Sequence, residues 1–352
     1  MKIKRIFALL FVSALIVLGC ASDYEILQSY DSVILTADSS NKLAGQTITF
    51  TVKDNNGTDH TQDARFFADG QEIDGNTLTS SELKSFVITA EFGGLTSEPL
   101  TVTFGDGSEL NFRKRVLIED YTGTWCGYCT RVAHAIELVK AQTDDVVPVA
   151  IHRPSSNENS ADYDPYNYEA ASVLEATLNA VGYPKGYINR RRRWNNPEPN
   201  NVAQVIALTQ GENPKLGLAL TPTVADGNIT LDVKVNFSKD FTGLKLVVYV
   251  LENGLIYEQH NYTEYYDSVD VIEDWEHEHV LRACLTDIMG DAISSDQTAI
   301  YTTYTRSFSV PVPPNVANAA NVEFVAFIVD ENGRAVNVRS AHPGDVQDFE
   351  ML

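Results

Sequence analysis

The stretch VLIEDYTGTWCGYC, from Val116 to Cys129, decides how the central part of this chain folds. Its first three residues form a short apolar run that predicts a buried strand, and apolar residues at helical spacing follow Cys129. A strand and a helix therefore enclose two cysteines that stand two residues apart, which makes the common CxxC spacing a specific signal. Such a pair is a structural disulfide, half of a metal site or a working redox centre.

The three possibilities differ in what else they require. A zinc site needs further soft ligands, which Cys284 with His277 and His279 would have to supply. A disulfide that closes so small a loop restrains little chain entropy and stabilises weakly. We therefore favour the redox centre and expect no metal and no cofactor.

At this point the sequence resembles the thioredoxin fold. In that fold an acidic residue stands six positions before the first cysteine, and Asp120 occupies this place. A cis-proline is the second mark of the fold, and Pro184 in VGYPKG supplies it. The resemblance implies a redox-active disulfide between Cys126 and Cys129, with the loop of Pro184 packed against it.

The residues of the motif suggest their roles in this chemistry. Cys126 is predicted at a helix N-terminus, where backbone N–H groups favour a thiolate, so it would be the attacking nucleophile. Cys129 would resolve the mixed disulfide, and Asp120 would accept and return its proton. Trp125 would cover the disulfide and offer a flat apolar contact, and Pro184 would leave neighbouring backbone free to pair with a substrate strand.

Two departures from the thioredoxin pattern concern the surroundings of the disulfide. Tyr128 stands where thioredoxin has proline, and the bulky Tyr183 precedes the cis-proline, so both are expected to border the substrate groove. His152 and Arg153 end the strand predicted after the CxxC helix, on the edge that carries the motif. They would add positive potential near Cys126, or be ordinary strand-end residues.

The N-terminal residues predict export. Basic residues precede the apolar run Ile6 to Leu18, which is too short for a comfortable membrane span and normal for a signal peptide. Gly19-Cys20 at its end resembles the lipobox of bacterial lipoproteins, which implies cleavage after residue 19 and a lipid on Cys20. The alternative is an ordinary signal peptide with an incidental cysteine. We expect a protein anchored to the outer membrane by its N-terminal lipid, with its body in the periplasm or on the cell surface.

The rest of the chain is predicted to be β-rich. Alternating apolar and polar residues, separated by Asn-Gly and Asp-Gly turns, indicate short strands before residue 107 and again after residue 213. Asn253-Gly254 and Asn332-Gly333 each stand between two apolar runs and predict hairpins. Between these β regions, Asp164-Pro165 predicts the start of a helix that runs to about Leu178. The fold class is thus a thioredoxin-like α/β domain between an N-terminal immunoglobulin-like β-sandwich and a C-terminal β-sandwich. The predicted parts are a signal peptide (1–19), a tether and sandwich (20–107), a thioredoxin-like domain with a helical insertion (108–212) and a second sandwich (213–352).

Composition limits the partners. The formal net charge of −22 at pH 7 disfavours binding to nucleic acid. The run of four arginines from Arg190 to Arg193 does not reverse this and is interpreted as a solvated or salt-bridged strip, with an anion site as the alternative.

Taken together, TGTWCGYC, the predicted export signal and the attached β domains resemble the Omp28-related outer-membrane lipoproteins. This resemblance covers roughly Lys114 to the C-terminus and is strongest around the motif. The predicted function is thiol–disulfide exchange on exported polypeptides, with a separate redox partner protein. The alternative is a non-enzymatic surface lipoprotein, a binding or adhesion module that keeps a thioredoxin frame.

Overall fold

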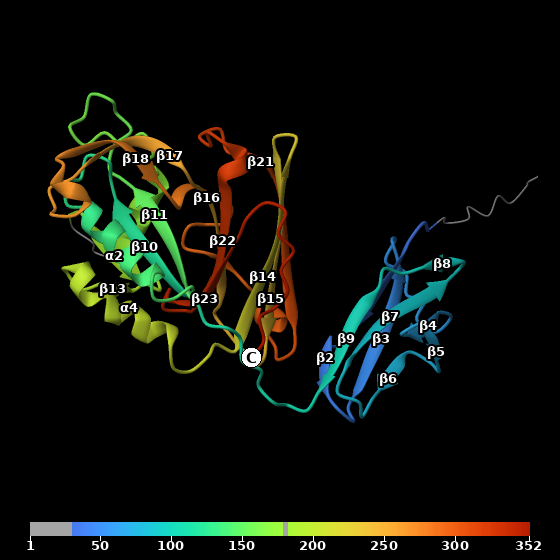
Figure 1. The fold of residues 1–352 in the computed structure, drawn as a ribbon. Helices are drawn as coiled ribbons and strands as arrows, with labels where there is room; N and C mark the ends of the chain where they lie inside the picture. The colour runs from blue at the N-terminus through green and yellow to red at the C-terminus, as the bar shows by residue number, and fades with distance from the viewer. Residues whose placement is uncertain (1–29, 179–181) are drawn as a thin grey trace, which may run out of the picture. The chain divides into compact units, whose positions relative to one another are not determined.

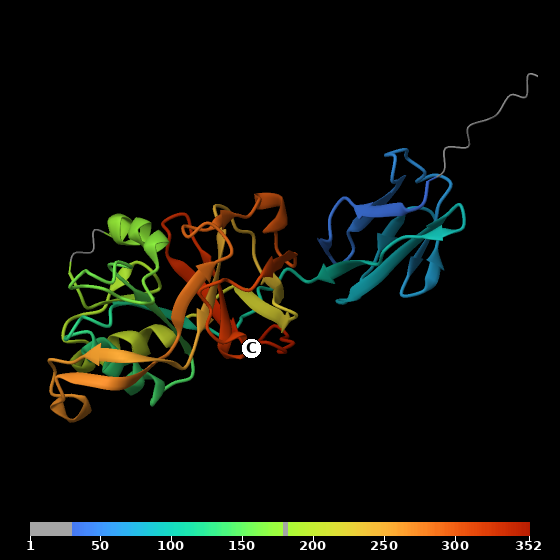
Figure 2. The ribbon, with the colours of Figure 1, turned by 90° about the horizontal axis from the view of Figure 1, so that it is seen from above.

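The computed structural model describes residues 30–178 and 182–352, which form two compact units (Figures 1 and 2). The first unit consists of the described residues up to Asp38 together with Thr47–Leu78 and Phe86–Val102. The second consists of Ser39–Gln46, Thr79–Ser85 and Thr103–Leu352. The predicted signal peptide and Cys20 lie outside the described residues.

The N-terminal part is built from short strands in two sheets, with the orders β1-β3-β6 and β2-β9-β7-β4-β5, and β8 pairs with β7. The apolar side chains of β3 are buried and the alternate ones are more exposed, and the Phe50 and Phe66 rings of the two sheets stack at 6.0 Å. This is the pattern of a two-sheet β structure with one shared core. The strands are β1 (Val33–Ala37), β2 (Asn41–Leu43), β3 (Thr47–Asp54), β4 (Arg65–Ala68), β5 (Gln71–Ile73), β6 (Thr77–Thr79), β7 (Ser85–Phe92), β8 (Leu95–Thr96) and β9 (Leu100–Gly105).

The second unit is organised by one nine-stranded sheet with the order β13-β12-β10-β11-β19-β16-β22-β23, to which β20 adds beside β16. β10 is parallel to β11, and β11 is parallel to β19, whereas the other neighbours are antiparallel. The strands are β10 (Val116–Thr122), β11 (Val146–His152), β12 (Lys185–Ile188), β13 (Arg192–Arg193), β16 (Lys245–Glu252), β19 (Val280–Cys284), β20 (Asp291–Ala292), β22 (Val322–Val329) and β23 (Ala335–Ala341).

Two kinds of element cover one face of this sheet side by side. Helices pack on the β10 end, where Val132 and Val205 join Val116 and Ile118 in one core. A three-stranded sheet, β14-β15-β21, packs on the β16–β22–β23 end and forms the largest core. The elements are α2 (Thr130–Lys140), α4 (Val202–Thr209), the 3-10 turn η2 (Glu198–Asn201), β14 (Leu216–Ala225), β15 (Asn228–Phe237) and β21 (Thr303–Pro311).

The opposite face carries a second core beneath α3 (Ser172–Leu178) and the preceding turn η1 (Glu169–Ala171). Alternate residues of the same strands supply it, so Leu117 and Tyr121 of β10 face this core while Val116 and Ile118 face α2. The remaining elements are the hairpin β17 (Leu255–His260) and β18 (Val271–His277) and three single turns, η3 (Tyr266–Ser268), η4 (Ser295–Gln297) and η5 (Ala319–Asn321).

Two features differ from the sequence-based expectation. The sheet continues across the predicted boundary at residues 212 and 213, because β19, β16, β22 and β23 extend the sheet that β10 and β11 begin. The helix expected from Asp164 to Leu178 begins only at Ser172, after η1. Asp164 does not cap it, because its carboxylate accepts hydrogen bonds from Tyr166 N and Thr124 N instead.

Candidate functional site

The cysteine pair lies in the turn between β10 and α2. Cys126 and Cys129 form a disulfide with a Cα–Cα distance of 5.4 Å. Because α2 begins at Thr130, Cys129 occupies the N-cap position and Cys126 lies in the preceding turn. Cys126 was expected at the helix N-terminus, but it lies one turn before it. Its sulfur is therefore further from the positive end of the helix dipole than expected.

A hairpin from the C-terminal half of the chain covers this turn. Strand β17 and the loop after it run beside the motif, so that His260 N donates to Thr124 O at 2.8 Å and Tyr262 N donates to Gly127 O at 2.6 Å. The buried Gln259 side chain donates to the Cys126 carbonyl at 3.2 Å. Figures 1 and 2 both show this orange hairpin alongside α2 and the β10 end of the sheet.

The cover leaves the sulfur-bearing residues almost inaccessible. Cys126 is 5% exposed and Cys129 is 1% exposed. Further contacts join the hairpin loop to α2, since Thr130 Oγ1 donates to Asn261 Oδ1 at 2.8 Å. Of this hairpin, the sequence pointed only to His277, as a possible metal ligand, and gave no sign that Gln259, His260 and Tyr262 contact the cysteine turn.

Asp120 lies behind the disulfide, where the sequence places it. The side chain is 4% exposed and its Oδ1 has no hydrogen-bond partner among the described residues. Burial raises the pKa of Asp120 well above its usual range; the nearby Glu198 carboxylate raises it further and Arg131 opposes both. Asp120 is therefore a carboxyl group that favours its protonated form.

Asp120 and Cys129 line the same cavity, which has a volume of about 180 Å³. His277 of β18 lines it too, and its Nε2 is buried without a partner among the described residues. Burial lowers the pKa of His277 to about 3, so the imidazole is neutral. A cavity of this size with two such polar atoms can hold several water molecules.

Asp164 joins three segments beside the motif. Its Oδ2 accepts a hydrogen bond from Thr124 N at 2.9 Å and lies 2.8 Å from His152 Nδ1. Burial by itself raises the pKa of Asp164, but His152 and the backbone donors bring it below the usual value. His152 thus holds the loop in place from the end of β11 and does not point freely at Cys126.

The predicted aromatic residues lie near the motif and contact other partners. The Trp125 indole donates to the Arg153 carbonyl at 2.8 Å, and its ring meets Tyr183 edge-on at 5.5 Å. Tyr128 is 55% exposed and meets the Tyr262 ring at 5.7 Å. The Tyr183–Pro184 peptide bond is cis, as the sequence predicts.

Arg153 does not supply unbalanced positive charge near Cys126. Its guanidinium pairs with Glu169 and Glu175, each at 3.0 Å, and Glu175 also pairs with Lys185 at 3.1 Å. This network fixes the segment around Tyr183, whose hydroxyl donates to Glu175. Arg153, which follows β11, therefore links that strand to η1 and α3 through ion pairs.

Cys284 is the remaining described thiol. It lies on β19 with intermediate exposure, and burial raises its pKa. Within residues 30–178 and 182–352, no group of three or more His, Cys, Asp or Glu side chains is placed to hold a metal ion. No helix in the described ranges is both long and apolar enough to cross a membrane.

Comparisons with known proteins match the chain to a protein family and to solved structures. The profile of the family described as "Outer membrane protein Omp28" matches residues 171–347. This range begins after the CxxC turn, so the match does not depend on Cys126 and Cys129, contrary to the expectation that the resemblance would be strongest there. No curated protein matches the chain at a significant level.

Among solved structures, HBP35 of Porphyromonas gingivalis resembles the chain with a TM-score of 0.50 at 19% identity, over 67% of this chain and 77% of that one. This likeness shows a shared fold and nothing about activity. The adhesin InvE of Yersinia pseudotuberculosis matches with a TM-score of 0.16 at 11% identity, over 88% of this chain and 58% of that one. A DUF4785 family protein of Legionella pneumophila matches with a TM-score of 0.18 at 8% identity, over 89% and 56%. Scores this low carry no structural argument.

Proposed function

Because the chain belongs to the Omp28 family of outer membrane proteins, we propose that it is a non-enzymatic binding or adhesion protein of the outer membrane, anchored by a lipid on Cys20. In this proposal the segment around Cys126 and Cys129 keeps a thioredoxin-like frame whose disulfide is structural. The N-terminal lipid would attach the protein to the membrane.

The observation that carries the proposal is the burial of the disulfide beneath the β17–β18 hairpin. Exchange requires a thiolate to approach along the sulfur–sulfur bond, so the attacked sulfur must be accessible. Here Cys126 is 5% exposed, and three hydrogen bonds from Gln259, His260 and Tyr262 hold the hairpin against its turn. A disulfide enclosed in this way ties the turn together and gives a polypeptide substrate little room.

The test compares the mature protein with a Cys126→Ser variant, both in a Cys284→Ser background that removes the other described thiol. We expect neither protein to reduce insulin or to oxidise a dithiol peptide above the uncatalysed rate. Activity in the parent that Cys126→Ser abolishes would overturn the non-enzymatic proposal. For the anchor, incorporation of radiolabelled palmitate that persists in Cys20→Ser would contradict lipidation at that residue.

A second candidate is thiol–disulfide exchange on exported polypeptides, and the position of Asp120 favours it. The raised pKa of Asp120 makes its carboxylate form a stronger base, which can take a proton from the Cys129 thiol through water in the cavity that they share. In the reduced protein the Cys126 thiolate would attack a substrate disulfide and form a mixed disulfide. Cys129, deprotonated by Asp120, would then attack Cys126, releasing the reduced substrate and regenerating the Cys126–Cys129 disulfide.

This second function needs a redox partner protein, because two electrons must return to the disulfide for each turnover. Trp125, Tyr128, Tyr183 and Pro184 would border the substrate groove as the thioredoxin resemblance implies. A Cys129→Ser variant tests it, since the substrate would remain attached to Cys126 and mass spectrometry would identify it. Absence of any mixed disulfide in cells expressing that variant would count against exchange.

A further inference from the structure

A shallow groove in the second unit gathers positive charge. Its volume is about 810 Å³, and it is bordered by the turn after β12, the loop between α4 and β14, the loop before β16 and the turn between β22 and β23. Three acidic residues line it, against six basic ones: Lys114, Arg191, Arg192, Lys215, Lys239 and Arg334.

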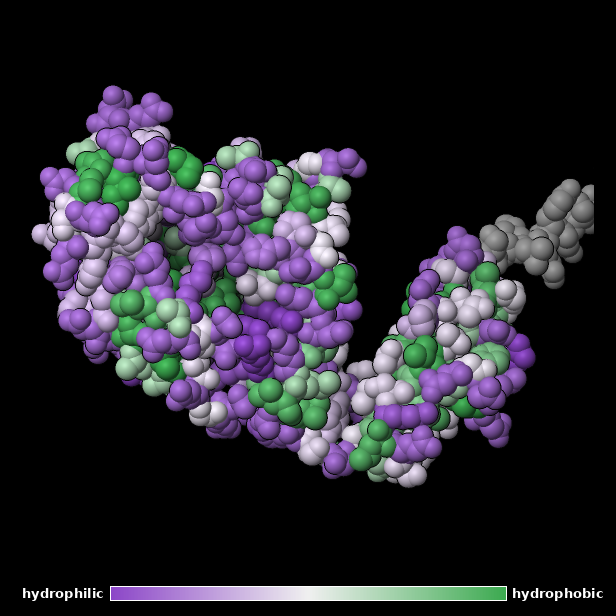
Figure 3. All heavy atoms as spheres, in the orientation of Figure 1, coloured by the Kyte–Doolittle hydropathy of each residue, from purple (hydrophilic) through white to green (hydrophobic). Residues whose placement is uncertain are grey.

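The excess of basic over acidic residues around the groove is opposite to the charge balance of the whole chain. The sequence has 26 lysines and arginines against 48 acidic residues, yet basic residues outnumber acidic ones two to one around the groove. In Figure 3 the larger unit is mainly hydrophilic on the face shown, and its hydrophobic residues form small separate groups. A concave site lined by one sign of charge concentrates ligands of the opposite sign.

The backbone of the β12–β13 turn divides the arginine run between the interior and the groove. Asn189 and Arg190 both have positive φ, 47° and 69°, which non-glycine residues adopt rarely. Asn189 holds this shape, because its Oδ1 accepts from Leu117 N at 3.0 Å and its carbonyl accepts from Ala335 N at 3.1 Å. Arg190 consequently points inward, while Arg191 and Arg192 are exposed and line the groove.

The inward residue, Arg190, is ion-paired as a salt-bridged strip would be, but it is buried where a surface position was expected. Arg190 is 2% exposed, its Nε lies 3.4 Å from Glu119 Oε1, and it donates to the Tyr249 hydroxyl. This buried pair anchors the turn to the centre of the sheet. The position of the next two arginines is therefore set by the core and not by the surface alone.

Contacts with the β22–β23 turn hold one of these cations, Arg191, in place. Arg191 Nε donates to the Asn332 carbonyl at 2.6 Å, and its guanidinium lies so close to Gly333 that a Cβ there would stand 3.1 Å from Nη2. Asp330 is occupied within its own turn, where Oδ1 accepts from Asn332 N and Arg334 N, each at 2.9 Å. One of the three acids is thus used by the fold. Asp330 Oδ2 also lies 3.4 Å from Arg334 Nε, and Lys215 Nζ lies 3.2 Å from Glu109 Oε2, so these two cations are already ion-paired. Arg191 is ordered before a ligand binds, which lowers the entropic cost of binding there.

We propose that this groove binds a ligand that carries two or more phosphate groups, either as a soluble polyphosphorylated molecule or as a lipid headgroup. Guanidinium groups match phosphate oxygens in pairs, and a ligand with several phosphates uses cations spread along a groove. The inference deepens the proposed binding role by naming the class of ligand, and it uses no residue of the disulfide turn.

The test uses isothermal titration calorimetry of the mature, unlipidated protein with inorganic tripolyphosphate as the probe. Arg192→Glu and Arg193→Glu form a matched pair, because both residues are exposed, adjacent on β13 and change the net charge equally, but only Arg192 lines the groove. We expect Arg192→Glu to weaken binding at least about tenfold and Arg193→Glu to weaken it less than about threefold. Lys239→Glu, on another wall of the groove, should behave like Arg192→Glu.

Co-sedimentation with vesicles that contain cardiolipin, whose headgroup carries two phosphate groups, distinguishes the two sources of phosphate. Vesicle binding that is lost in Arg192→Glu identifies a lipid headgroup, whereas tripolyphosphate binding without vesicle binding identifies a soluble ligand, and either result supports the groove. Absence of both kinds of binding, or equal losses in Arg192→Glu and Arg193→Glu, overturns it. Insulin reduction measured on the same preparations reports separately on the non-enzymatic proposal, so the two can fail independently.

Discussion

The ring of Tyr262 occupies the space where a side chain at Gly127 would stand. The Tyr262 N–H donates to the Gly127 carbonyl at 2.6 Å, and a Cβ added to Gly127 would lie 2.3 Å from the Tyr262 ring. A glycine inside the CxxC turn is therefore required by the hairpin that covers the turn. The motif and the hairpin, more than 130 residues apart in sequence, fit each other closely.

This fit predicts that Gly127→Ala displaces the hairpin. Overpacking of a tight contact costs about 1–3 kcal/mol, so we expect a loss of that order in the free energy of unfolding. The disulfide should also react faster with a phosphine reductant, because its cover is loosened. Urea titration and the reduction rate measure the two effects.

A double-mutant cycle supplies the control for Gly127→Ala. A Tyr262→Ala background removes the three atoms nearest to the added methyl group, so the same substitution should cost less than about 0.5 kcal/mol. Equal costs in both backgrounds would show that the clash with Tyr262 is not the cause.

Replacement of Asp120 by asparagine should stabilise the oxidised protein at neutral pH. The pKa of Asp120 is raised in the folded state, so folding favours the protonated acid. Its contribution to stability is full below the unfolded pKa of about 4 and declines as the pH rises towards the folded pKa. We expect Asp120→Asn to be more stable by roughly 1–3 kcal/mol at pH 8, with the difference shrinking towards pH 4.

Urea denaturation across this pH range checks the direction as well as the size. A difference that grows as the pH falls would contradict a raised pKa at Asp120. Asp164→Asn provides the contrast, because the pKa of Asp164 is lowered and its carboxylate holds Thr124 N and His152. That variant should be destabilised at neutral pH.

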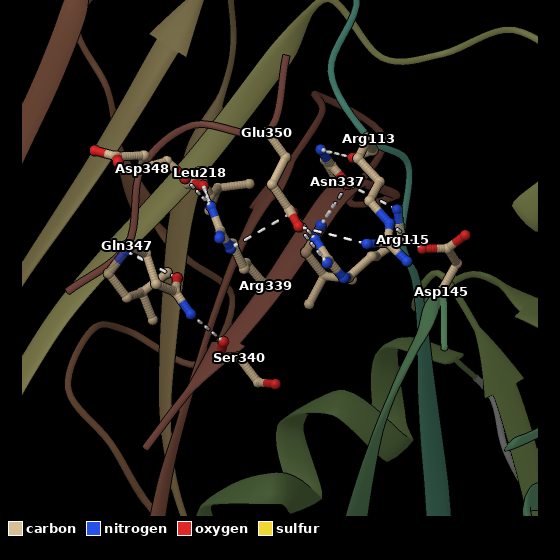
Figure 4. Close-up of polar contacts among 12 residues, drawn as sticks. Arg113, Arg115, Asp145, Leu218, Asn337, Arg339, Ser340, Gln347, Asp348 and Glu350 are labelled. Carbon is tan, nitrogen blue, oxygen red and sulfur yellow. Dashed lines mark hydrogen bonds and ion pairs between the residues drawn. The ribbon is translucent and has the colours of Figure 1, made fainter. Parts of the chain in front are cut away.

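The C-terminal segment is predicted to lose stability in acid through Glu350. Figure 4 shows Arg113, Arg115 and Arg339 converging on this carboxylate, with Arg115 Nη2 donating to Oε1 at 2.8 Å. The Arg115 guanidinium lowers the pKa of Glu350 from its ordinary value of 4.5. The stabilisation is present above pH 4.5 and disappears as the pH falls through the lower folded pKa.

For Glu350→Gln we therefore expect a loss of about 1–2 kcal/mol at pH 7 that disappears in acid. Glu331→Gln, an exposed acid outside this cluster, should have a negligible effect at either pH. Thermal unfolding at pH 7 and pH 3 measures both variants. A constant deficit for Glu350→Gln at the two pH values would exclude the charge as its origin.

Removal of Arg190 should be among the most damaging single changes in the chain. Arg190→Met leaves the Glu119 carboxyl fully buried beside Tyr249 without its cation, a situation that costs about 3–5 kcal/mol. The double variant Glu119→Leu, Arg190→Met should recover most of that loss. If the double variant is no more stable than Arg190→Met when both are unfolded with urea, the buried ion pair is not responsible.

Local sequence predicted the elements around the disulfide well. The apolar run at Val116 became β10, the helical spacing after Cys129 became α2, and Pro184 follows a cis peptide bond. Each of these features depends on residues that are neighbours in the chain. Over such short distances, hydrophobic periodicity and turn-forming residues are informative.

Two Asn-Gly pairs show where this local reasoning stops. Asn332-Gly333 joins β22 to β23 as a hairpin, as predicted. Asn253-Gly254 was expected to do the same, but β16 and β17 do not pair; β17 leaves the main sheet and pairs with β18 over the CxxC turn. The dipeptide specifies a turn, whereas the partner of the following strand is decided by distant contacts such as that of Gly127 with Tyr262.

The arginine run illustrates the same limit at a single side chain. Composition alone makes four consecutive arginines look like one surface feature, but the positive φ of Asn189 and Arg190 sends one of them into the core. Nothing in the run itself distinguishes Arg190 from its neighbours. Glu119, with which Arg190 pairs, lies within the largely apolar strand β10. A charged residue in a strand predicted to be buried was the one indication in the sequence that a basic residue would be buried beside it.

The place of β19 in the sheet bears on how such proteins can diversify. A gene fragment that ends at residue 212 would encode the cysteine turn and its helix but would leave β11 with a bare edge, since residue 280 supplies the neighbour of Ala150. Genetic recombination at that point would expose the unpaired edge of a β-strand, which favours aggregation. The parts of the larger unit before and after residue 212 should therefore be inherited together. New functions should arise through changes in its loops.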